Sequence, residues 1–166
     1  MNPDSLFLGA LSTLLVEIFE GPPGNEAFVL NPKDPGLLRQ LEALSHEVAS
    51  KRPMAGVTTV AAHVDHVHYG LSLLNRWGSG EANPWADADW TTSWKRTSVT
   101  ADEWQTLCAK LRQASKTWQK IVPQVKEWNT LTVAGALASA AHTAYHLGAI
   151  RQILAAMDAN AAPRDS

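Results

Sequence analysis

The sequence lacks the features that mark several protein classes. It has one cysteine, Cys108, in 166 residues, so no disulfide can form within the chain and we expect a reducing, cytoplasmic setting. Its apolar runs, such as Leu14–Leu15–Val16, are far shorter than the roughly 20 residues that cross a membrane. The start of the chain, Met1–Ser5, carries an acidic rather than a basic residue, which argues against a secretory signal. Membrane proteins and disulfide scaffolds are therefore excluded.

The excess of acidic over basic residues is also small. The chain has 14 Lys and Arg against 16 Asp and Glu, a formal net charge of −2. Nucleic-acid binding needs a basic face, so we expect no nucleic-acid partner. The apolar share of 45% is enough to bury a core, and the length suits one domain over residues 1–166, with a disordered tail at about 160–166.

Apolar residues recur at helical rather than strand spacing. No strand pattern is longer than Ala27–Leu30. We expect four main helices over residues 4–20, 57–76, 101–122 and 132–159, and a surface helix over 36–50. Thr100 and Glu103 form a capping-box pattern at the start of the third main helix. This pattern predicts an all-α fold, an antiparallel four-helix bundle with an extra surface helix and a Trp-rich connecting loop.

Two segments stand out between and within these helices. The loop after the second main helix carries Trp85, Trp90 and Trp94, which would either pack over a helix end or form an aromatic lid on a pocket. The first half of the last helix, residues 134–144, is nearly all small residues. They would either let helices approach closely or leave room for a site.

Five of the six histidines fall into two groups on predicted long helices. His142 and His146 are four residues apart, which places them within about 40° of one another and about 6 Å apart along the axis. Both rings can then face one metal ion. Ala138 and Ile153 share this face, so it should point into the bundle.

The other group lies on the second main helix. His63 shares the apolar face with Val60 and Val67, while His66 is rotated from it by about 60° and His68 by about 140°. We therefore predict His63 as the third ligand, His66 as its neighbour or substitute, and His68 as solvent-exposed. The alternative is a set of buried histidines without metal, although an unpaired buried polar ring costs about 1–3 kcal/mol.

Two motifs resemble the DinB-like family. Its last helix carries H-x-x-x-H followed by a glycine, an aliphatic residue and often R-Q, which is similar to residues 141–152, AHTAYHLGAIRQ. Its second helix carries an apolar run followed by a histidine, which is similar to residues 60–66, VAAHVDH. The resemblance implies a four-helix bundle that holds a divalent metal through His63, His142 and His146, and a homodimer formed through helix faces.

Three histidine ligands would leave open positions on the ion, where the pKa of a bound water or thiol falls. Zinc or nickel suits such ligands. His66 and Tyr145 are candidate catalytic residues, Asp65 and Glu17 are weaker candidates for a base, and Arg151 is a candidate anion contact.

Proteins of the DinB-like family, which this chain resembles, include thiol-dependent transferases and isomerases, and many members have no known reaction. We therefore expect a metal-dependent hydrolase or thiol transferase that acts on a small molecule or a low-molecular-weight thiol. The alternatives are a ligand-binding or stress-linked protein without turnover, or a helical interaction protein.

Overall fold

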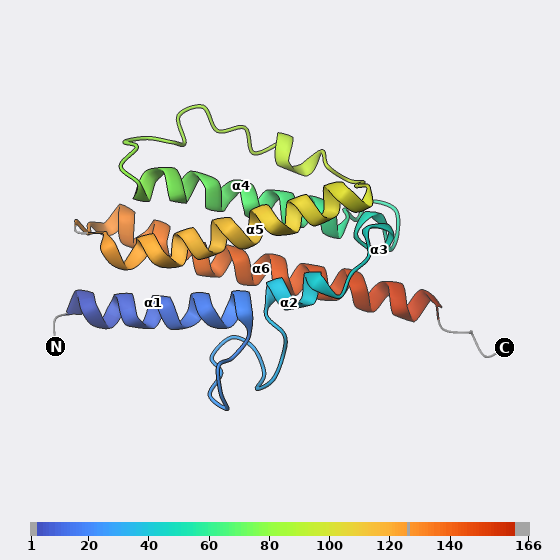
Figure 1. Ribbon diagram of the computed structural model, residues 1–166, viewed down its shortest axis with the longest axis horizontal. Helices are drawn as coiled ribbons and strands as arrows, with labels where there is room; N and C mark the ends of the chain where they lie inside the picture. Colours follow the sequence, from blue (N-terminus) through green and yellow to red (C-terminus); the bar gives the residue numbers. More distant parts are fainter. Residues whose placement is uncertain (1–2, 126, 162–166) are drawn as a thin grey trace.

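The computed structural model describes residues 3–125 and 127–161, and this part of the chain is all-helical, without a strand (Figure 1). The predicted all-α class is confirmed. None of the helices described is long and apolar enough to span a membrane. The α-helices are α1 (Pro3–Glu20), α2 (Leu37–Glu42), α3 (His46–Ser50), α4 (Val60–Gly78), α5 (Ala101–Ile121) and α6 (Thr130–Ala161), and two 3-10 turns, η1 (Thr92–Trp94) and η2 (Val122–Gln124), flank α5.

The four long helices lie close to their predicted ranges, and local capping explains their ends. At the start of α5, Thr100 Oγ1 accepts from Glu103 N at 3.3 Å and Thr100 N donates to Glu103 Oε2 at 2.8 Å, which is the predicted capping box. The predicted surface helix 36–50 is instead two short helices, because Ser45 caps a new one. Helix α6 extends to Ala161, and the remainder of the predicted tail lies outside the described residues.

The long helices α1, α4, α5 and α6 lie lengthwise beside one another, with contacts between their apolar faces (Figure 1). The burial of these faces holds the fold together, since apolar area removed from water is the main favourable term in folding. The core includes Phe19 of α1, Val67 of α4, Trp118 of α5 and Ile150 of α6, all at most 1% exposed.

The directions of the helices differ from the predicted antiparallel order: α1 and α6 lie side by side and run in the same direction, and so do α4 and α5 (Figure 1). Asn75 Nδ2 of α4 donates to Ala114 O of α5 at 2.9 Å, and Gly78 at the end of α4 lies against Ile121 at the end of α5. These two helices therefore run parallel. The cause is the long connection over residues 79–100, which returns the chain to the other end before α5 begins (Figure 1). Helices α4 and α6 do run antiparallel, and this pair builds the site.

The loop between α1 and α2 is fastened by one buried carboxylate. Glu17 is 1% exposed, and its Oε1 accepts from the backbone N–H groups of Phe28, Val29 and Leu30 at 3.0, 2.7 and 2.7 Å. Burial raises the pKa of Glu17, but the three backbone donors outweigh it and hold the pKa below its ordinary value. The charged form of Glu17 is thus part of the fold.

We expect Glu17→Gln to destabilise the protein by about 1–2 kcal/mol, because a neutral amide replaces a charged, buried acceptor of three backbone N–H groups. Urea unfolding at pH 7 measures this. Glu26→Gln is the matched control on the exposed part of the same loop and should change stability by less than about 0.5 kcal/mol. Equal unfolding midpoints for the two variants would contradict the role of Glu17.

Candidate metal centre

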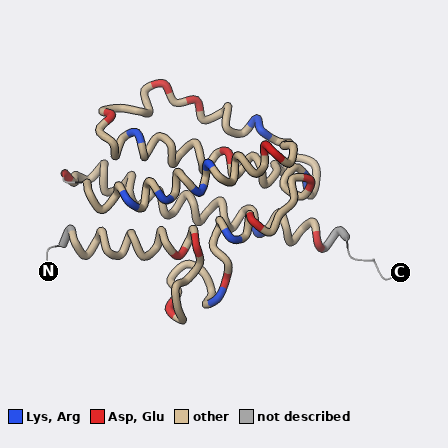
Figure 2. The backbone as a smooth tube through the Cα atoms, viewed as in Figure 1, with Lys and Arg blue, Asp and Glu red and all other residues tan. Residues whose placement is uncertain are grey.

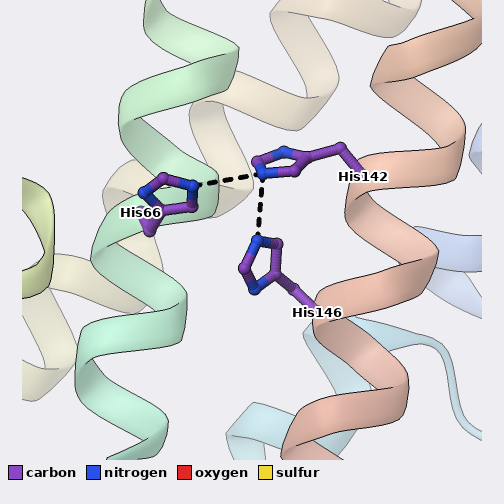
Figure 3. A group of neighbouring side chains, drawn as sticks. All are labelled: His66, His142 and His146. Carbon is purple, nitrogen blue, oxygen red and sulfur yellow. Dashed lines mark hydrogen bonds between the residues drawn. The ribbon is translucent and has the colours of Figure 1, made fainter. Parts of the chain in front are cut away.

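The antiparallel packing of α4 against α6 brings four histidines together. Nε2 of His142 lies 3.2 Å from Nε2 of His66 and 2.9 Å from Nε2 of His146. Figure 3 shows the three rings turned toward one another from the two helices. Their ligand nitrogens all lie within 4.8 Å of one another. These three histidines therefore lie close enough to bind one metal ion.

The spacing of these nitrogens fits a small divalent ion. Zinc binds histidine nitrogen at about 2.0–2.1 Å, so two such ligands of a tetrahedral ion lie about 3.3 Å apart. The distances from Nε2 of His142 to Nε2 of His66 and of His146, 3.2 and 2.9 Å, are close to that separation. All three ligands are imidazoles, which suit zinc and nickel. The residues present thus fit the predicted ion.

The hydrogen bonds of His66 fix which of its nitrogens is free. Ser93 Oγ donates to Trp90 O at 2.9 Å, so its oxygen accepts from Nδ1–H of His66 at 2.8 Å. Nε2 of His66 then carries a lone pair, and it faces His142 and His146. An outer partner that fixes the tautomer in this way is typical of metal-binding histidines.

His63 occupies a different place from the one that the sequence predicts. Its Nδ1 lies 2.8 Å from Nδ1 of His146, on the side of that ring opposite the shared centre. His63 and His66 are each 7% exposed, so both face inward. The geometry brings together His66, His142 and His146, with His63 as the hydrogen-bond partner of His146.

Burial keeps these rings neutral. It is the main cause that lowers the pKa of His146 to about 3 and that of His66 to about 4, and repulsion from His142 and His63 adds to it. Burial also lowers the pKa of His63 and His142. Neutral imidazole is the form that binds a metal ion, so the site needs no deprotonation at pH 7.

The Trp-rich loop covers the histidines. Trp94 stacks on His66 with ring centroids 4.3 Å apart and meets His63 edge-on at 5.2 Å. The sequence singled out Trp94 but not Ser93. The pattern Asp89–Thr91–Thr92 could have shown that this segment is ordered, because Asp89 accepts from the backbone N–H and the hydroxyl of both threonines and so holds the turn η1.

Several other predicted residues lie elsewhere. Asp65 pairs with Arg96 at 3.0 Å, and Glu17 is committed to its loop. Arg151 holds Asp34 at 3.1 Å and Pro35 O at 2.8 Å, so it fastens the α1–α2 connection. Tyr145 is 69% exposed, although its ring meets that of His146 edge-on at 5.0 Å.

Burial also sets the properties of His68 and Cys108. His68 is half-buried rather than solvent-exposed, and burial lowers its pKa. Cys108 on α5 is also half-buried, and burial raises the pKa of its thiol to about 11, which makes it a poor nucleophile at neutral pH.

A cavity of about 820 Å³ lies beside the histidine group. Its walls are the second half of α4, the first half of α6 and the Trp-rich loop, and His142 belongs to its lining. The small residues of α6 therefore leave room for a site, and Trp85 and Trp90 form part of its wall.

Comparison with protein-family models, with curated proteins and with solved structures gave no match. The DinB-like resemblance therefore stays a prediction from two short motifs, and the geometry of this chain carries the functional argument.

Protonation of the buried histidines should destabilise the metal-free protein in weak acid. In the unfolded chain a histidine binds a proton near pH 6.5, whereas His66 and His146 resist protonation down to about pH 4 and 3. Their contribution to stability is present above pH 6.5 and is lost progressively as the pH falls toward 4, because the unfolded chain binds the protons that the folded chain resists. Urea unfolding between pH 6.5 and 5 measures this slope. His66→Gln should reduce it, and an unchanged slope would show that His66 does not resist protonation.

Proposed function

We propose that the chain is a metal-dependent enzyme with a DinB-like four-helix bundle, which acts on a small molecule with a thiol or water as the nucleophile. One observation carries the proposal: three histidine nitrogens converge at the edge of a cavity large enough for a substrate. Cavities of about 300–1,000 Å³ are typical of small-molecule sites.

In this proposal His66, His142 and His146 hold zinc or nickel. The ion would lower the pKa of a water molecule or thiol at an open position toward neutrality. Ser93 orients the ring of His66, and His63 orients that of His146, each by a hydrogen bond to Nδ1 at 2.8 Å. His142 completes the set on the cavity side, so a substrate in the cavity would lie next to the centre.

The surroundings favour thiol transfer over hydrolysis. Activation of water is helped by a general base, and the described residues that line the cavity include no carboxylate. Asp65 and Glu17 are both committed to other partners. A thiol bound to the ion would release its proton to water, and the resulting thiolate is a strong nucleophile that needs no separate base.

A ligand-binding protein without metal is the second candidate, and one observation favours it. If Nδ1 of both His66 and His146 carries a hydrogen, one hydrogen on His142 Nε2 satisfies both contacts among the three rings. The histidines would then form a closed hydrogen-bonded group. Metal content separates the two candidates.

Protein purified without a histidine tag should bind about one equivalent of zinc or nickel. The double variant His142→Ala, His146→Ala should lose this binding and keep its helicity, because alanine is a strong helix former. Elemental analysis and calorimetric titration measure metal content, and circular dichroism measures helicity. A wild-type protein that stays metal-free in excess zinc and nickel would overturn the enzyme proposal.

Single variants in the same titration distinguish His66 from His63. Loss of a ligand in His66→Ala should weaken zinc binding by more than 100-fold, whereas loss of an outer partner in His63→Ala should weaken it by about 10- to 100-fold. The opposite order would restore His63 as the ligand on α4.

The metal-loaded protein should also lower the pKa of an added thiol. Cobalt replaces zinc as a coloured reporter, and cysteine or 2-mercaptoethanol serves as the thiol. We expect a new near-ultraviolet absorption band that saturates with thiol at pH 7, and no band with the His142→Ala, His146→Ala variant. A cobalt-loaded wild-type protein whose spectrum does not change with thiol would exclude thiol transfer and leave hydrolysis.

A further inference from the structure

The walls of the cavity beside His142 are mostly apolar and carry no charged side chain among the described residues. Trp77, Trp85 and Trp90 lie on the α4 and loop side, and small residues such as Ala134 and Gly135 lie on the α6 side. Aromatic walls opposite small residues make a slot that offers apolar contact to a flat molecule.

No Lys, Arg, Asp or Glu occurs among the described residues that line this cavity. Helix α6 has none between Thr130 and Ile150, so this stretch is drawn in tan in Figure 2. A charged ligand would leave water here without a partner of opposite charge, which costs several kcal/mol. The cavity thus selects against ions.

The polar groups of the lining are mostly in use already. The hydroxyls of Thr132, Ser139 and Thr143 each donate to a backbone carbonyl, at 3.0, 2.6 and 2.8 Å. His142 lines the cavity too, and its ring reaches the histidine group. Asn83 also lines the cavity but is exposed, whereas His142 is half-buried, so a ligand with one polar end inside the cavity finds its partner at His142.

The walls also leave apolar surface in water. Trp85 is 38% exposed and Trp90 is 40% exposed, and Ala134 and Ala138 on the facing helix are exposed as well. A molecule that fills the cavity would remove this surface from water, at about 25 cal/mol per Å² of apolar area.

We propose that this cavity binds an uncharged, largely apolar molecule, such as an aromatic alcohol or ketone, with its polar end toward His142. As a substrate site it rests on the proposed function, because it names the class of molecule on which the metal centre acts. The binding itself needs only the cavity, so it can be measured without metal.

The test uses three naphthalene probes that differ in charge: 1-naphthol, 1-naphthoate and 1-naphthylmethylammonium. Calorimetric titration of the metal-free protein at pH 7 should show saturable binding of 1-naphthol, and at least tenfold weaker binding of the two ions. Equal affinity for all three, or no saturable binding of 1-naphthol, would overturn the inference.

The variant Gly135→Leu tests whether 1-naphthol binds in this cavity. Gly135 lies seven residues before His142, so the two share a face of α6 within about 20°. An added Cβ meets no atom within 4 Å, and the leucine side chain would extend into the open space. We expect at least a tenfold loss of 1-naphthol affinity without a loss of fold, because leucine is a better helix former than glycine.

Gly148→Leu is the matched control. It lies on the same helix, its added Cβ also meets no atom within 4 Å, and it does not line the cavity, so its affinity should equal that of wild type. Unchanged 1-naphthol affinity in Gly135→Leu would overturn the inference. Zinc titration keeps the two proposals apart: a protein that binds zinc but not 1-naphthol refutes the cavity inference, and one that binds 1-naphthol but no metal refutes the proposed function.

Discussion

The antiparallel packing of α4 against α6 is the constraint on which the site depends. The two helices place His63 opposite His146 and His66 opposite His142, so positions that are far apart in sequence meet in pairs. Neighbouring apolar side chains such as Val67 and Ile150 are fully buried and hold the two backbones at this distance. Close packing of the interior leaves the imidazoles little freedom to turn away. The histidine group is therefore a product of the core rather than an addition to its surface.

The Trp-rich loop joins the histidines and the cavity into one structural unit. Ser93 bonds to both His66 and the carbonyl of Trp90, while the ring of Trp90 lines the cavity. A molecule that shifts Trp90 would thus act on the orientation of His66. Since binding energies are linked reciprocally, occupation of the histidine centre would act on the cavity by the same amount. Asp89 holds the start of the 3-10 turn η1 in place, because it accepts hydrogen bonds from Thr91, which precedes the turn, and from Thr92, its first residue.

Helical periodicity was enough to predict the all-α class and the approximate ranges of α1, α4, α5 and α6. It could not give the parallel course of α4 and α5, because periodicity carries no information on the path of the connection between them. It could not separate His63 from His66 either. Both side chains point inward. His66 is oriented toward the histidine centre by its hydrogen bond to Ser93, which lies in a loop without helical periodicity. Asp65, Glu17 and Arg151 show the same limit, since their partners lie on loops that the helical pattern does not place.

The distribution of charge connects the centre to the chemistry proposed for it. Three neutral imidazoles would leave a divalent ion its double charge, and no carboxylate among the described cavity-lining residues offsets that charge. In such surroundings electrostatic attraction is much stronger than in water. With an ion bound, an anionic nucleophile would be favoured at the centre itself, whereas the described residues of the cavity wall next to it carry no charge and would suit a neutral, largely apolar molecule. A reaction between a thiolate and an uncharged electrophile makes use of both environments, while two charged reactants would leave one of them without a favourable place.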